Sequence, residues 1–157
     1  MSESRYPQLK TLKKLRLFIL NTIKDLTVEE LNKVPNGYGN NIIWNIAHLV
    51  AAQEGVCYMR SGQTPNVSIE FFNAYKPGSK PERNLTEKEI EEIKQLLLTS
   101  VDQLENDLAQ GKFVNYKGWT TRYDVEMNNI EDALNFLPFH EGMHLGYIMA
   151  LKRNREI

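Results

Sequence analysis

The chain contains only three histidines, His48, His140 and His144, and two of them lie close together near its carboxyl end. His140 and His144 enclose the segment HEGMH, which has the H-E-x-x-H form of helical zinc sites in metalloproteases. Positions four residues apart lie on one face of an α-helix, so both imidazoles can reach a single metal ion. The pair therefore predicts two ligands of a metal site.

A peptidase of this type needs a third ligand downstream of the motif, and the sequence does not provide one. Residues 145–157 contain no histidine, and their only acidic residue is Glu156. No segment has the alternation of apolar and polar residues that would predict the β-sheet of a protease substrate cleft. The third ligand must come from upstream, where His48 is the candidate. The motif thus predicts metal binding but not a zinc peptidase.

His48 shares a helical face with Trp44 and Ala52, while His140 and His144 continue an apolar stripe, so all three are expected to point inward. Each alone could be a core histidine with ordinary hydrogen-bond partners. Burying three imidazoles without partners is costly, whereas one divalent cation satisfies them all. A three-histidine site also leaves coordination positions for water or substrate, which is typical of a reactive centre.

Three further side chains are candidates for a role beside the metal. Glu141 lies at the edge of the stripe, where it could act as a catalytic general base or form an ion pair at the helix flank. Arg122 and Tyr123 precede the helix that carries the histidine pair, and we expect them to bind a thiol cofactor or substrate. A guanidinium binds carboxylates through two hydrogen bonds, although an arginine that faces solvent is the alternative.

The elements that position these residues are helices, because four segments have helical periodicity and none has a convincing strand pattern. The predicted helices begin near residues 7, 40–41, 86 and 128–129 and end near residues 26, 60, 108 and 152. Thr86 and Glu89 form a capping box at the third helix, and Pro138 predicts a kink in the fourth.

Two long connections, residues 61–85 and 111–127, separate these helices, and the second could hold a short extended stretch. Long loops of this kind are often lids or binding loops. We therefore predict an all-α fold with a single domain over residues 1–157. It should be a single four-helix bundle with two long connecting loops.

Composition narrows the possible partners. A formal net charge of -1 and a pI of about 6.3 argue against nucleic-acid binding. No apolar run has transmembrane length and no signal peptide is evident, so we expect no membrane association and a cytoplasmic location. Cys57 is the only cysteine and is expected to be buried rather than nucleophilic. The cationic side chains of Lys10, Lys13, Lys14 and Arg16 predict a solvated helix edge.

The segments WNIAHL, which contains His48, and HEGMHLGYIMALKR resemble those of the DinB-like superfamily. These four-helix-bundle proteins are related to bacillithiol transferases and mycothiol-dependent maleylpyruvate isomerases. The resemblance implies that His48, His140 and His144 bind a divalent metal ion, commonly zinc, nickel or iron. It also implies a homodimer, with which the apolar Leu17 and Phe18 are compatible.

The predicted function is that of a metal-dependent enzyme that acts on a small-molecule substrate. It would activate a low-molecular-weight thiol or water, as a thiol S-transferase or hydrolase does. Two alternatives remain open. The protein could be a non-catalytic metal or small-ligand binding module of a stress response, or a dimerising bundle with vestigial histidines.

Overall fold

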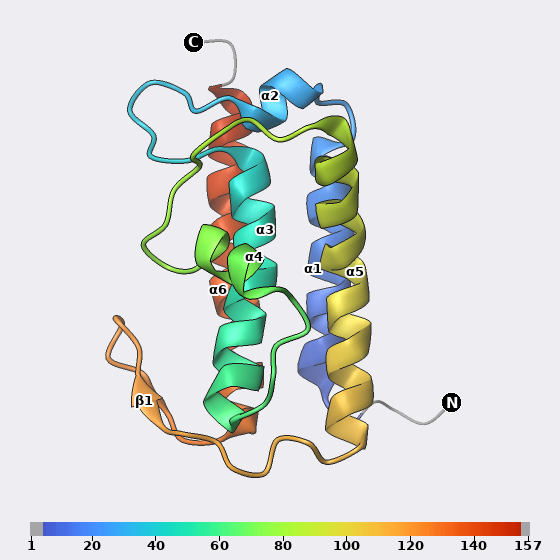
Figure 1. The fold of residues 1–157 in the computed structure, drawn as a ribbon, viewed down its shortest axis with the longest axis vertical. Helices are drawn as coiled ribbons and strands as arrows, with labels where there is room; N and C mark the ends of the chain where they lie inside the picture. Colours follow the sequence, from blue (N-terminus) through green and yellow to red (C-terminus); the bar gives the residue numbers. More distant parts are fainter. Residues whose placement is uncertain (1–4, 155–157) are drawn as a thin grey trace.

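The computed structural model describes residues 5–154, which form a helical protein with one small hairpin; Glu156 lies outside them. The long helices are α1 (Pro7–Ile23), α3 (Ile42–Gln53), α5 (Glu87–Ala109) and α6 (Ile130–Arg153), which lie side by side (Figure 1). The short elements are α2 (Val28–Asn32), α4 (Ile69–Tyr75) and the antiparallel strands β1 (Trp119–Thr120) and β2 (Glu126–Met127). The predicted all-α fold is confirmed.

Capping side chains determine where the last two long helices begin. Thr86 Oγ1 accepts a hydrogen bond from the Glu89 backbone N–H at 3.3 Å, and the Glu89 carboxylate accepts one from the Thr86 N–H at 2.8 Å. Asn129 Oδ1 accepts the Asp132 N–H at 2.9 Å. Each contact satisfies an N–H that lacks a partner within the helix. Both helices therefore begin where the sequence predicts, and α6 continues through Pro138.

The four long helices enclose a shared apolar interior. Both α1 and α3 pack against α5 and α6, and Figure 1 shows α3 beside α6. Ile46, Leu97 and Ile148 belong to one core cluster, and a second cluster contains the buried Cys57. Every residue of α3 is buried, so this helix is the central element and carries His48 into the interior.

The structure differs from the sequence prediction in the connections. The second predicted helix changes its winding after Gln53, with a π-helical turn over Glu54–Tyr58 and a 3-10 turn over Met59–Ser61. Gly62 ends it with φ +68°, a conformation that glycine adopts without strain. The connection 61–85 contains α4, which packs on α3. The connection 111–127 contains the β1–β2 hairpin, so the short extended stretch predicted there is present. None of the helices within residues 5–154 is long and apolar enough to cross a membrane.

Candidate metal centre

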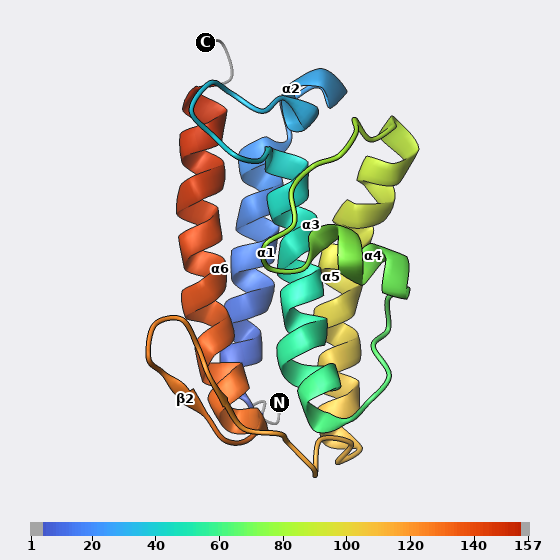
Figure 2. The same cartoon turned by 60° about the vertical axis from the view of Figure 1, so that its left-hand side comes forward.

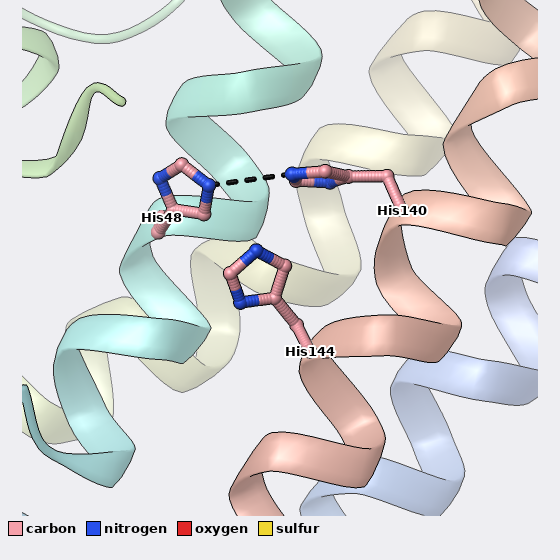
Figure 3. Close-up of side chains that lie close together, drawn as sticks. All are labelled: His48, His140 and His144. Carbon is pink, nitrogen blue, oxygen red and sulfur yellow. Dashed lines mark hydrogen bonds between the residues drawn. The ribbon is translucent and has the colours of Figure 1, made fainter. Parts of the chain in front are cut away.

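The three histidines converge between α3 and α6. His48 comes from α3, and His140 and His144 come from successive turns of α6 (Figure 3). One nitrogen of each ring lies within 4.8 Å of a nitrogen of each of the others. The Nε2 atoms of His48 and His140 are 3.3 Å apart. The structure thus brings together the three residues that the sequence singled out.

Hydrogen bonds from the outer nitrogens hold two of the rings. His48 Nδ1 donates to the backbone carbonyl oxygen of Tyr75 at 2.7 Å, because that oxygen can only accept. His144 Nδ1 donates to Asn45 Oδ1 at 2.8 Å, and the Asn45 amide nitrogen donates to two neighbouring oxygens, which identifies Oδ1 as the acceptor. A neutral imidazole protonated at Nδ1 has its lone pair on Nε2. Both rings therefore direct a lone pair toward the centre of the cluster.

The third ring has no such support, since His140 Nδ1 is buried without a hydrogen-bond partner. Its Nε2 faces the lone pair of His48 Nε2. A cation between the rings would accept the Nε2 lone pairs of all three histidines. A set of neutral nitrogen donors is chemically suited to zinc, nickel or iron, and imidazole ligation alone does not choose among them. The residues present therefore fit a divalent metal ion.

Burial keeps these imidazoles neutral, as metal ligands must be. Desolvation, followed by electrostatic interactions with His144, His48 and Arg122, lowers the pKa of His140 to about 3. Desolvation, followed by the charge of His48, lowers the pKa of His144 to about 4. The pKa of His48 is lowered by burial and by Arg122, against the opposing effect of its bond to the Tyr75 carbonyl. At neutral pH the lone pairs are available without loss of a proton.

Two aromatic rings pack against the histidine cluster. The Trp44 ring stacks on His48 with 4.8 Å between centroids and 9° between planes. The Phe136 ring lies 5.8 Å from the ring of His140. Trp44 and His48 are 6% and 4% exposed, so solvent scarcely reaches this side of the cluster. Electrostatic interactions are stronger in such a low-dielectric environment than in water.

Glu141 does not belong to this cluster. Its carboxylate forms an ion pair with Arg16, and both side chains are 0% exposed. Arg16 Nε donates to the two carboxylate oxygens at 3.1 and 3.2 Å, and Arg16 Nη2 donates to Oε1 at 2.5 Å. The structure thus contains the ion pair that was the alternative to a general base, although it is buried rather than at the helix flank. The solvated position predicted for Arg16 is wrong, because its guanidinium is needed to neutralise this carboxylate.

Arg122 and Tyr123 lie in the exposed turn between β1 and β2. The positive charge of Arg122 lowers the pKa of both His48 and His140, which places its guanidinium within electrostatic range of the cluster. The Tyr123 ring instead contacts the Phe139 ring of α6, with 5.6 Å between centroids. Binding of a thiol or substrate by Arg122 and Tyr123 stays a prediction.

Sequence reasoning missed the two groups that orient the rings. Asn45 lies three residues before His48 on α3, so its position on the same buried face could have identified it. Tyr75 contributes a backbone carbonyl from the end of α4, and no side-chain pattern could have indicated that contact. Outer partners of this kind fix which nitrogen carries the proton.

The fold and the cluster define a class of protein in which two helices of an all-α chain supply three histidines suited to one metal ion. The chain belongs to the DinB superfamily, whose family model matches residues 12–148 and so includes all three histidines. This match confirms the resemblance seen in WNIAHL and HEGMH. A comparison with curated proteins finds no match.

Proposed function

We propose that His48, His140 and His144 bind one divalent metal ion and that the protein is a metal-dependent enzyme. The observation that carries this proposal is the convergence of three neutral imidazoles, of which two have their Nδ1 protons held by Asn45 and the Tyr75 carbonyl. Three protein ligands leave coordination positions for a substrate atom, which distinguishes a reactive site from a closed structural one.

The reaction type that this site supports best is activation of a low-molecular-weight thiol or of water. A divalent cation bound there lowers the pKa of a coordinated thiol or water toward neutrality. Asn45 and the Tyr75 carbonyl keep the rings of His144 and His48 in the orientation that directs Nε2 inward. Arg122 attracts an anionic group of the incoming thiol or substrate.

Metal content tests the first part of the proposal. Protein purified without a nickel column and then exposed to zinc, nickel or ferrous iron should retain about one ion per chain, the stoichiometry that three converging ligands support. His48→Ala should lose most of that metal, because only two imidazoles remain. Trp44→Phe serves as the matched control, since it keeps a ring against His48 without changing a ligand. Metal below stoichiometry that is unaltered in His48→Ala would refute the site.

Activity assays test the second part. Metal-loaded protein is incubated with a panel of low-molecular-weight thiols paired with electrophiles, and separately with activated esters and amides. We expect turnover that requires the metal and is lost in His48→Ala. Arg122→Ala should raise KM selectively for anionic substrates, whereas uncharged ones are unaffected. A stoichiometrically loaded protein that is inert toward the whole panel would instead support a non-catalytic binding module.

A further inference from the structure

A hollow of about 340 Å³ lies between the hairpin and the first turns of α6. Figure 2 shows the hairpin alongside this end of α6. Its lining includes the rings of Tyr123, Phe136 and Phe139 and the side chains of Val125 and Glu126. The volume is within the range of small-molecule sites in proteins.

The lining of the hollow is mainly apolar and is open to solvent. Tyr123, Val125 and Phe139 are 44%, 45% and 51% exposed. The Phe136 ring lies 5.8 Å from the Phe139 ring and 6.5 Å from the Tyr123 ring, so the three aromatics form one continuous surface. Leaving grouped apolar surface in water is unfavourable, and such patches commonly mark binding sites. An apolar ligand would gain affinity by covering them.

Phe136 joins this hollow to the histidine cluster. Its ring lines the hollow and also lies 5.8 Å from the ring of His140, with 30° between the planes. Arg122, whose charge acts on His140, immediately precedes Tyr123 in the same turn. The hollow and the histidine cluster are therefore neighbours that both contact the Phe136 ring. A molecule of modest length could occupy both.

Charge defines which ligands the hollow can accept. Glu126 and Asp132 line it, and no lysine or arginine among residues 5–154 does. A negatively charged group placed beside Glu126 and Asp132 would be repelled by like charges. An uncharged aryl or alkyl group would meet mainly rings and aliphatic carbon. The hollow therefore favours an uncharged apolar group over an anionic one.

We propose that the substrate of the metal centre carries an uncharged aromatic or alkyl arm that packs in the hollow beside Phe136 and Phe139, while its metal-binding end reaches the three histidines. This inference rests on the proposed function, because it takes the histidine cluster to be the reacting end. It adds the substrate class, namely small molecules with an apolar arm and no anionic group on that arm.

Hydroxamates provide the test, since they bind metal ions through one end and can carry different arms. Zinc-loaded protein is titrated calorimetrically with acetohydroxamate, benzohydroxamate and 4-carboxybenzohydroxamate. We expect benzohydroxamate to bind about tenfold more tightly than acetohydroxamate, the gain from burying part of an aryl group. The carboxylated compound should lose that gain because of Glu126 and Asp132.

Variants locate the effect in the hollow. Phe139→Ala should remove most of the gain for benzohydroxamate while leaving acetohydroxamate unchanged, and Glu126→Gln should improve binding of the carboxylated compound. Phe18→Ala is the matched control, because Phe18 is 52% exposed on α1, away from the hollow, and Phe139 is 51% exposed. Equal affinities for the first two hydroxamates, or a gain that survives Phe139→Ala, would overturn this inference alone. Failure of acetohydroxamate to bind would overturn the proposed metal site as well.

Discussion

Replacing Glu141 by glutamine separates a structural role of this residue from a catalytic one. Glu141 and Arg16 are both fully buried, and Arg16 Nη1 also donates to the Leu97 carbonyl at 2.8 Å and to Ser100 Oγ at 2.9 Å. Glutamine keeps the shape of the side chain but removes its charge, which leaves the guanidinium buried without a counter-ion. Removing one partner of such a pair costs about 3–5 kcal/mol. Since domains are stable by only about 5–15 kcal/mol, this is a large share of the total.

Urea unfolding at pH 7 measures this loss, and thermal unfolding should show a lower Tm by on the order of 10 °C. The double variant Arg16→Met/Glu141→Leu should recover much of the loss, because apolar side chains of similar volume replace the pair. Glu92→Gln provides the control. Its partner Lys88 lies 3.9 Å away and the two side chains are 64% and 87% exposed, so the change in stability should be small.

Metal binding should survive in Glu141→Gln once the variant is folded, since this side chain bonds to Arg16 and not to a histidine. A purely structural role for Glu141 would be excluded if the variant unfolded at the same urea concentration as the unmodified protein while its metal-dependent activity disappeared. That combination of results would return Glu141 to the role of general base.

Two further predictions concern the histidines. The free energy of unfolding of metal-free protein should fall as the pH drops from about 6.5 toward 4. In the folded protein, the pKa values of His140 and His144 are lowered to about 3 and about 4, so both rings stay neutral over most of this range. The same histidines bind protons in the unfolded chain, which stabilises the unfolded state. Urea unfolding across this range should give a shallower pH dependence in a variant with both histidines replaced by asparagine, and an unchanged slope would contradict the cause given. Asn45→Ala should weaken zinc binding by about 10–100-fold in competition with a chelator, because His144 loses the acceptor that orients its ring. Asn73→Ala, at an exposed position on α4, is the control. Equal zinc affinities in Asn45→Ala and Asn73→Ala would argue against the role of Asn45 in orienting His144.

Most features of the fold that could be predicted from the sequence depend on residues close together in the chain. The capping box of Thr86 with Glu89 and the cap at Asn129 involve residues within one helical turn, so they are readable without knowledge of the tertiary structure. His140 and His144 lie four residues apart, and the stripe they continue indicated that they face the interior. Their convergence with His48 could be predicted because burying three imidazoles without polar partners is costly.

The features that could not be predicted depend on contacts between residues far apart in the sequence. The Arg16–Glu141 pair spans 125 residues, and only the position of Arg16 within the stripe of Leu12 and Ile19 could have indicated that it is buried. The Tyr75 carbonyl reaches His48 because α4 folds back onto α3, which depends on tertiary packing rather than on a residue pattern. The homodimer stays a prediction.

The proposed function requires that His48, His140 and His144 together hold one divalent ion. X-ray absorption spectroscopy of zinc-loaded protein tests it most directly, since the spectrum reports the number and kind of ligand atoms. We expect three imidazole nitrogens at about 2.0–2.1 Å plus one or two oxygen atoms from solvent, and two imidazoles when any one histidine is replaced. A first shell with no more than one imidazole, or one unchanged by removal of His48, would contradict it.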